Sequence, residues 1–152
     1  MSPERKPVRR GWLNMKIVFD TNVILDVLGE RVPFAAVSTE AMAVVERKGI
    51  VGAMTANTIT DLYYLLRQRK IEPGMVKDAL MKLMEALEVL DTTGALCRLA
   101  VDSPVTDFED AVLAESAKLW SADFIVTRNE DDFANSPVKA ITPTDLLQRF
   151  AK

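Results

Sequence analysis

The chain has 152 residues, 49% of them apolar and 27% charged, which is the composition of one globular domain. It contains no histidine and a single cysteine, Cys97. This excludes histidine-based acid–base catalysis, histidine-ligated metals, thiolate zinc clusters and internal disulfides. No stretch is long and apolar enough for a transmembrane span or a signal peptide, so we expect a cytoplasmic protein without membrane contact.

The net charge of −3 is distributed unevenly along the chain. Residues 1–16 carry five basic residues against one acid, whereas residues 102–132 carry nine acids against two basic residues. We expect residues 1–14 to be a flexible basic leader, with an RNA-binding arm as the alternative, and residues 15–152 to be one domain. Carboxylates crowded into one stretch repel each other, and a bound cation would relieve that repulsion.

Short apolar runs alternate along the chain with segments whose apolar residues have helical spacing, and this alternation predicts the fold class. Runs that end at polar residues predict strands at 16–20, 50–55, 88–90, 123–127 and 138–141. Helical spacing predicts helices at 21–29, 34–48, 59–66, 73–87, 94–101, 107–121 and 143–150. Asn57 or Thr58 is the expected cap of the third helix, and Pro73 lies in the first turn of the fourth. Strands that alternate with helices form βαβ units, so we expect an α/β protein with a mainly parallel sheet and helices on both faces.

Two polar residues, Asp20 and Thr127, end the first and fourth predicted strands. Ligands of parallel α/β sheets bind at the carboxyl ends of the strands, where both residues are expected to lie. Asp20 has two interpretations. It is either the N-cap of the helix that follows, or a metal ligand or nucleophile in a crevice at the strand ends.

The acidic helix predicted at 107–121 begins with three carboxylates in four residues. Thr106 and Glu109 have the spacing of a capping box, which accounts for both of them structurally. Asp107 and Asp110 are left over, and because they are three residues apart they share one face of the helix. The helix dipole favours acids in a first turn, but three carboxylates so close together favour a bound cation.

Three other aspartates, Asp26, Asp61 and Asp78, lie inside predicted helices. For Asp61 a solvent-exposed helix position and a role in the site are both open, because apolar residues flank it on either side. For Asp26 and Asp78 the solvent-exposed position is the preferred interpretation.

A polar segment follows the strand predicted at 123–127. Such segments are often only a turn and a cap, but Arg128 could contact a phosphate, and Asn129 or Asp132 could approach a cation. Several aspartates without any histidine make an all-oxygen site, which suits Mg²⁺ or Mn²⁺. Such an ion binds phosphate oxygens and activates water, and it reverses the repulsion between an acidic pocket and a phosphodiester.

Five motifs occur in order along the chain. They are F-D-T-N at 19–22, T-I-T-D-L-Y-Y-L-L at 58–66, D-F-E-D-A-V-L-A at 107–114, V-T-R-N-E-D-D-F at 126–133 and T-P-T-D-L-L at 142–147. Together they resemble the PIN-domain ribonucleases, especially the small prokaryotic single-domain type that includes VapC-like toxins. The match covers about residues 16–148, and it implies a three-layer α/β/α sandwich that cleaves single-stranded RNA with Mg²⁺ or Mn²⁺.

The resemblance also implies roles for residues at matching positions. Asp20 would be the first metal ligand, with Asn22 supporting its loop. Asp110 would be the second ligand, with Asp107 beside it as a further ligand. Asp61 stands where the family more often has glutamate, so a water could bridge its shorter side chain to the metal. Asp61 would then position or deprotonate the attacking water, and cleavage would leave 5′-phosphate and 3′-hydroxyl ends.

A second departure from the family pattern concerns Asn129, which stands where many members have a further aspartate. Asp132 is the candidate to replace it as a metal ligand. The expected contacts to the RNA substrate are Asn22, Thr127, Arg128 and Asn129. Small toxins of this type pair with an antitoxin and dimerise, so the resemblance implies a cognate antitoxin and a homodimer as partners.

Two other functions remain open at this point. A phosphohydrolase with Asp20 as nucleophile, as in haloacid-dehalogenase-like proteins, usually needs a second aspartate two residues on, and this chain has Asn22 there. A PIN-fold module that binds RNA or protein without catalysis is compatible with the departures at Asp61 and Asn129.

Overall fold

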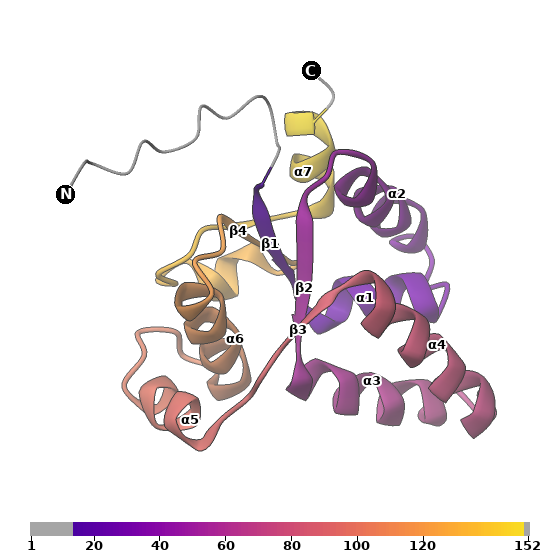
Figure 1. The fold of residues 1–152 in the computed structure, drawn as a ribbon, viewed down its shortest axis with the longest axis horizontal. Helices are drawn as coiled ribbons and strands as arrows, with labels where there is room; N and C mark the ends of the chain where they lie inside the picture. Colours follow the sequence, from indigo (N-terminus) through magenta and orange to yellow (C-terminus); the bar gives the residue numbers. More distant parts are fainter. Residues whose placement is uncertain (1–13, 151–152) are drawn as a thin grey trace.

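A five-stranded parallel sheet forms the centre of the molecule (Figure 1). The structure is a computed structural model that describes residues 14–150, so the predicted leader lies outside the described residues except for Asn14. The strands are β1 (Lys16–Phe19), β2 (Val51–Thr55), β3 (Glu88–Leu90), β4 (Phe124–Val126) and β5 (Ala140–Ile141). They lie in the order β3-β2-β1-β4-β5 with every neighbouring pair parallel, which confirms the predicted sheet.

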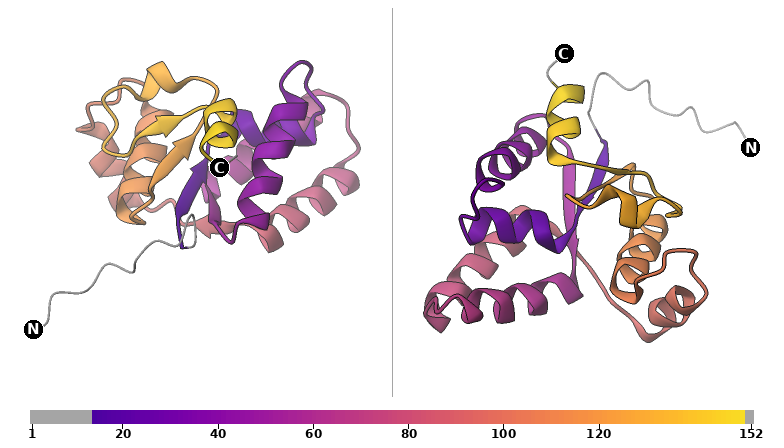
Figure 2. Two further views of the ribbon diagram at one scale, coloured as in Figure 1. Left: turned by 90° about the horizontal axis from the view of Figure 1, so that it is seen from above. Right: turned by 180° about the vertical axis from the view of Figure 1, so that it is seen from behind.

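Helices cover both faces of this sheet and complete a three-layer α/β/α sandwich (Figures 1 and 2). One face carries α1 (Thr21–Leu28), α2 (Ala35–Arg47), α3 (Ala56–Gln68), α4 (Pro73–Ala86) and α7 (Pro143–Phe150). The other face carries α5 (Gly94–Val101), α6 (Phe108–Leu119) and the short 3-10 helix η1 (Glu130–Phe133). None of the helices within residues 14–150 combines the length and the apolar character that crossing a bilayer requires.

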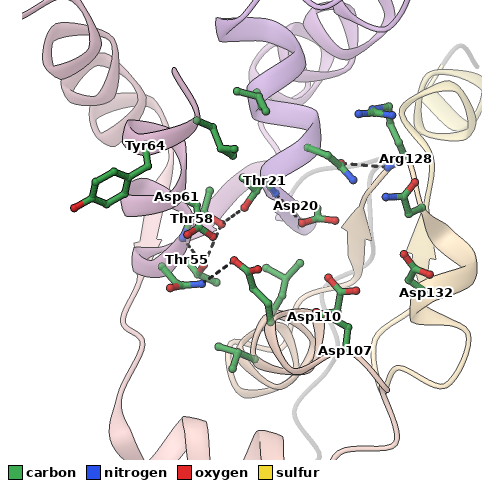
Figure 3. A pocket seen from close by; sticks show the side chains of 18 of the residues that line it. Asp20, Thr21, Thr55, Thr58, Asp61, Tyr64, Asp107, Asp110, Arg128 and Asp132 are labelled. Carbon is green, nitrogen blue, oxygen red and sulfur yellow. Dashed lines mark hydrogen bonds between the residues drawn. The ribbon is translucent and has the colours of Figure 1, made fainter. Parts of the chain in front are cut away.

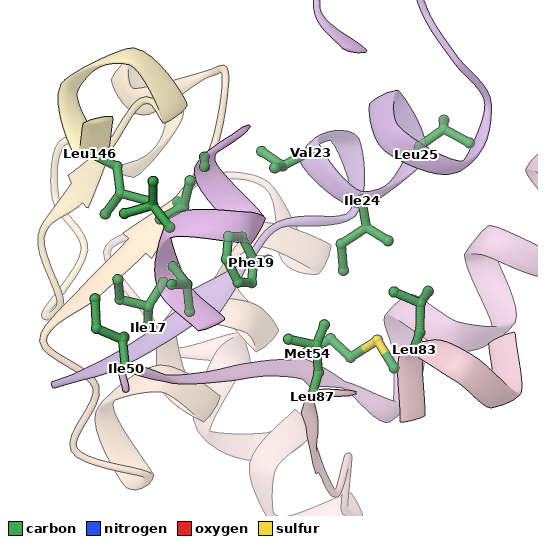
Figure 4. Packing of buried hydrophobic residues seen from close by; sticks show 14 of the residues in the cluster. Ile17, Phe19, Val23, Ile24, Leu25, Ile50, Met54, Leu83, Leu87 and Leu146 are labelled. Carbon is green, nitrogen blue, oxygen red and sulfur yellow. The ribbon is translucent and has the colours of Figure 1, made fainter. Parts of the chain in front are cut away.

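The central strands send alternate side chains into two apolar cores. Ile17 and Phe19 of β1 lie in the core beneath the five-helix face, where Figure 4 shows Phe19 near Met54. Val18, between them, lies in the core beneath α5 and α6. All three β1 side chains are completely buried, and each contributes about 1.5–3 kcal/mol through burial. A parallel strand buried on both faces needs a continuous apolar run, which is why the sequence predicts β1 well.

One predicted helix start is wrong. Helix α3 begins at Ala56, and its N-cap is Thr55, whose side chain accepts a hydrogen bond from the backbone N–H of Thr58. Asn57 and Thr58 therefore lie inside the helix instead of capping it. The cap must be the last residue with extended backbone, and threonine and asparagine are both favoured there, so composition did not distinguish the candidates.

The strand order determines where a site can form. From β1 the chain continues to β2 on one side, whereas β4 pairs with β1 on the other side. At such a reversal of strand order the following segments diverge, and a crevice opens at the carboxyl ends of the two strands. Asp20 and Thr127 are the residues immediately after β1 and β4.

Candidate active site

A pocket of about 610 Å³ opens at the carboxyl end of the sheet, between α1, α3, α6 and the segment after β4 (Figure 3). Negative charge dominates its lining. The charged residues that line it are Asp20, Asp61, Asp107, Glu109, Asp110, Asp132, Arg31 and Arg128. Every residue predicted for catalysis or metal binding therefore lines one pocket, although these residues come from distant segments of the chain.

Asp20 is fixed by contacts with both strands of the crevice. As the N-cap of α1 it accepts a hydrogen bond from the backbone N–H of Thr21 at 2.7 Å. Its second carboxylate oxygen accepts a hydrogen bond from the hydroxyl of Thr127 at 2.8 Å. Burial raises the pKa of the Asp20 carboxyl, and these two hydrogen bonds oppose that rise. Asp20 therefore caps α1 and lines the pocket at the same time, so its two interpretations do not exclude each other.

Thr127 joins the loops that follow β1 and β4. While its hydroxyl donates to Asp20, it accepts hydrogen bonds from the backbone N–H of Asn129 at 3.1 Å and from Nδ2 of Asn22 at 3.4 Å. One donor and two acceptor positions are all that a hydroxyl offers, so this hydroxyl is fully used. Thr127 is also completely buried, which differs from the position expected of an RNA contact. Asn22 and Asn129 do line the pocket.

Asp107 is the N-cap of α6 and accepts a hydrogen bond from the backbone N–H of Asp110 at 3.0 Å. The capping box predicted from Thr106 and Glu109 is therefore wrong. Aspartate caps a helix at least as well as threonine, and the cap lies one residue later than the capping box places it. With Asp107 as the cap, Glu109 becomes free for another contact.

Asp110 lies half-buried in the first turn of α6 and interacts electrostatically with Asp20. Burial, followed by the charges of Asp20, Asp107 and Asp132, raises the pKa of Asp110 to about 6. Ala114, one turn further along α6, is completely buried, so a small residue lets the helix pack closely against the sheet. The predicted grouping of Asp107 and Asp110 near Asp20 agrees with this placement.

Asp61 and Glu109 meet across the pocket, from α3 and α6. The hydrogen bond between these two carboxyls, which requires a shared proton, is the main cause that raises the pKa of Glu109 to about 7. Burial and the charges of neighbouring aspartates add to the effect. Nδ2 of Asn57 donates a 3.3 Å hydrogen bond to Glu109, which further joins the two helices. Sequence reasoning missed Glu109 because the capping box had accounted for it.

The pocket suits a hard divalent cation in the kind of donors it offers. Carboxylate oxygens are the ligands that Mg²⁺ and Mn²⁺ prefer. The raised pKa values of Asp20, Glu109 and Asp110 mean that their charged forms are disfavoured without a cation. Within residues 14–150, however, no three acidic or cysteine side chains already form a set of metal ligands. A cation would have to draw the carboxylates together.

Asp26 is completely buried, so its predicted solvent-exposed position is wrong. It accepts hydrogen bonds from Nε of Arg128 at 2.7 Å and from the hydroxyl of Ser38 at 3.3 Å. The guanidinium of Arg128 also stacks on the ring of Phe34, with its carbon 3.9 Å from the ring centroid. A buried carboxylate is tolerated when it is paired. Its partner here lies 102 positions away along the chain, and one sequence does not reveal such a pairing.

The sheet order and the acidic crevice between β1 and β4 define an α/β protein whose site lies at the strand ends. A family model described as PIN domain matches residues 16–131. The chain belongs to the PIN-domain family, the nuclease family that the sequence motifs resemble.

Several solved structures share this fold. VapBC2 from Rickettsia felis, bound to a promoter DNA fragment, aligns with a TM-score of 0.64 and 17% identity over 84% of this chain and 98% of that chain. A toxin–antitoxin complex from Klebsiella pneumoniae gives a TM-score of 0.63 and 20% identity over 84% and 97%. DNA-bound VapBC from Salmonella typhimurium gives a TM-score of 0.62 and 18% identity over 85% of this chain and 98% of that chain. At these identities the likeness establishes the fold alone. The search of curated proteins finds no significant match.

Proposed function

We propose that this protein is an endoribonuclease that hydrolyses phosphodiester bonds of single-stranded RNA and depends on Mg²⁺ or Mn²⁺. The observation that carries the proposal is the convergence of six carboxylates on one open pocket at the carboxyl end of the sheet. Membership of the PIN-domain family supports nuclease chemistry at this place. The absence of histidine from the sequence leaves carboxylates and metal-bound water as the natural agents.

Asp20, Asp107 and Asp110 are the residues that would hold the ion, with Asp61 and Asp132 as further ligands. When bound, a divalent ion neutralises phosphate oxygens, makes water a better nucleophile and stabilises the leaving oxygen. Its charge would also offset the repulsion between the acidic pocket and the RNA backbone.

Other side chains in and beside the pocket would activate the water, orient Asp20 and bind the RNA. Asp61, which lines the same pocket as Asp20, positions or deprotonates the attacking water. Thr127 keeps the carboxylate of Asp20 in one orientation through its hydrogen bond. Arg128 and Asn129 line the pocket where the RNA strand would pass. The expected products carry 5′-phosphate and 3′-hydroxyl ends.

We further propose that the protein is the toxin of a cytoplasmic toxin–antitoxin pair and forms a homodimer. Support comes from the similar structures from Rickettsia felis and Klebsiella pneumoniae, which are described as a VapBC pair and a toxin–antitoxin complex. Light scattering of the purified protein tests the homodimer, and a monomer at all concentrations would contradict it. Growth arrest on expression, relieved by a co-expressed antitoxin, tests the pairing.

Cleavage assays with purified protein test the enzymatic proposal. The protein should cut single-stranded RNA with Mg²⁺ or Mn²⁺ and stop when a chelator is added. Asp20→Asn should fold normally and cut nothing. Asp78→Asn, which removes an exposed carboxylate on α4 away from the pocket, is the matched control and should cut as well as the wild type. Equal cutting by the folded Asp20→Asn variant would contradict the proposal.

Two other results would favour the remaining functions. A protein that binds RNA but cleaves none with any divalent ion would be a binding module. Trapping of a phosphoryl group on Asp20 would instead indicate a phosphohydrolase with an aspartate nucleophile.

A further inference from the structure

A buried ion cluster lies at the edge of the acidic pocket. Asp26 is the only completely buried acid within residues 14–150. Nε of Arg128 lies 2.7 Å from Oδ2 of Asp26, and Nε of Arg31 lies 3.6 Å from Oδ1. Oδ1 makes no hydrogen bond to any described residue, so the arginines alone balance its charge. The cluster therefore pairs one aspartate with two arginines.

Both arginines are held through Nε, at the inner end of the guanidinium. Arg128 is further fixed by stacking on Phe34. Within the described part of the chain, neither arginine uses its terminal Nη nitrogens in a hydrogen bond. The side chain of Arg128 is 19% exposed and that of Arg31 is 32% exposed, and both residues line the pocket. Their outer donors are thus oriented and unused.

The charge of this cluster differs from that of its surroundings. Two arginines against one aspartate leave one surplus positive charge, while the other charged residues of the pocket are all aspartates and a glutamate. In Figure 3, Arg128 lies across Asp20 from Asp61, on the side of the segment that follows β4. A planar guanidinium with free outer donors matches the oxygens of a phosphate. The cluster therefore supplies N–H donors together with the positive charge that a polyanion needs and that the rest of the pocket lacks.

We propose that Arg128 and Arg31 form a phosphate subsite for the RNA strand, next to the phosphate that is cleaved, and that Asp26 is the positioning residue that orients them. This inference rests on the proposed function and deepens it, because it names a second contact on the same strand. The carboxylates would act on the scissile phosphate while the arginines bind a neighbouring one. The strand would then cross the pocket from the side of Asp110 to the side of Arg128.

A purely structural role for the cluster predicts something different. Arg128 also links the end of β4 to α1 through Asp26. If that link were its only role, substitutions would lower stability without changing the number of phosphate contacts. The salt dependence of binding counts such contacts, because each neutralised phosphate of a single strand adds about 0.7 to the slope of log K against log salt.

Binding of a fluorescent oligouridylate, followed by anisotropy in a chelator at several salt concentrations, tests the subsite without requiring cleavage. Arg128→Gln should lower affinity about tenfold, and it should reduce the salt slope by about 0.7. Arg31→Gln should act in the same direction. Arg47→Gln removes the same charge from an exposed arginine on α2 that pairs with Glu40, and it should change neither quantity. Unchanged affinity and slope for Arg128→Gln would overturn the proposal.

Arg128→Lys separates charge from geometry. Lysine keeps the positive charge but offers one ammonium group, which cannot contact Asp26 and a phosphate with separate nitrogens. We therefore expect it to bind RNA nearly as weakly as Arg128→Gln. Wild-type affinity for Arg128→Lys would mean that only net charge matters, and the oriented subsite would be excluded.

Asp26→Asn tests the positioning role, because the two explanations predict opposite signs. Loss of a negative charge makes the protein more cationic, which by itself would tighten RNA binding. If Asp26 orients the arginines, binding weakens instead. The substitution should also add little to the loss already caused by Arg128→Gln. Tighter binding by folded Asp26→Asn would overturn the positioning role, and if this variant does not fold, Arg128→Lys decides.

Single methylphosphonates along the oligonucleotide locate the subsite. Neutralising the contacted phosphate should weaken binding to the wild type but not further weaken binding to Arg128→Gln.

The two proposals fail separately. If the wild type cleaves no RNA while Arg128→Gln loses affinity, the ribonuclease function fails and the subsite stands. If the wild type cleaves RNA and Arg128→Gln binds as tightly, the subsite alone is wrong.

Discussion

Thr127 donates a 2.8 Å hydrogen bond to Oδ2 of Asp20 and so joins the carboxyl ends of β4 and β1 beneath the acidic pocket. The two residues are 107 positions apart in the sequence. Because the same hydroxyl accepts hydrogen bonds from Asn129 and Asn22, one buried side chain fixes both loops of the crevice. The bond also opposes the rise that burial causes in the pKa of Asp20.

Thr127→Val is expected to weaken both the fold and the activity. Valine keeps the shape of threonine but removes the donor to Asp20, and an unsatisfied buried acceptor costs about 1–3 kcal/mol of the free energy of unfolding. The pKa of Asp20 should rise further, and each additional pKa unit lowers the charged fraction by up to about tenfold once the pKa exceeds the working pH. Denaturant unfolding and RNA cleavage rates measure the two effects.

Thr127→Ser is the control for this change, since serine retains the hydroxyl. It should keep most of the cleavage activity and most of the stability. A Thr127→Val variant that cleaves RNA at the wild-type rate would mean that the hydrogen bond has no part in positioning Asp20.

Asp110→Asn should make the metal-free protein more stable while it abolishes cleavage. Burial and the charges of Asp20 and Asp107 disfavour the ionised form of Asp110, whose pKa is raised to about 6. A neutral amide of the same shape removes that cost. Melting temperatures in a chelator at neutral pH measure the effect, with the exposed Asp78→Asn as the control that should change little. A lower melting temperature for Asp110→Asn would contradict the repulsion between carboxylates.

The order of the strands could be predicted only in part. The buried run Ile17–Phe19 is apolar because both faces of β1 are covered, so its strand was evident. The shorter β5, Ala140–Ile141, was predicted two residues too long, since the apolar residue Val138 before it is also buried. Alternation of strands and helices predicted a parallel sheet, but the order β3-β2-β1-β4-β5 depends on tertiary packing that no local pattern encodes.

The site was predictable where function and local pattern coincide. Asp20 stands out because it follows a buried strand, and Asp110 because it lies in a crowded acidic turn. Glu109 and Asp26 were misjudged for the same physical reason. Their partners, Asp61 and Arg128, are distant in sequence, and each residue had a satisfactory local explanation. Burial and long-range pairing decide such cases, and neither is visible in one sequence.

The stability of the metal-free protein should rise as the pH falls from about 8 to about 5. The pKa of Glu109 is raised to about 7 and that of Asp110 to about 6, from ordinary values of 4.5 and 3.8. The folded protein therefore takes up these protons at higher pH than the unfolded chain. The resulting stabilisation is complete below the ordinary values and is lost as the pH rises through the two raised pKa values. Solvent screening of these partly exposed groups keeps the effect modest.

Thermal melts in a chelator at several pH values measure this trend, and saturating Mn²⁺ should reverse it. A bound cation favours the charged carboxylates, so metal-dependent stabilisation should be largest at high pH and disappear as protons compete for the same oxygens. A melting temperature that drops in the chelator as the pH is lowered from 8 to 5 would contradict the raised pKa values.

Asp61→Asn should lower the pKa of Glu109. The hydrogen bond and charge of Asp61 are among the causes that raise this pKa to about 7, and the hydrogen bond is the largest of them. An asparagine amide is neutral and can donate a hydrogen bond to the ionised carboxylate, so it favours the charged form. Titration of the Glu109 side-chain carboxyl by carbon NMR in a chelator should show the midpoint moving toward the ordinary value of 4.5. Thr60→Ala, at the exposed neighbour of Asp61 on α3, is the control and should leave the midpoint unchanged. A midpoint that stays near neutrality in Asp61→Asn would mean that burial and the other aspartates hold the proton, and that the two carboxyls do not share it.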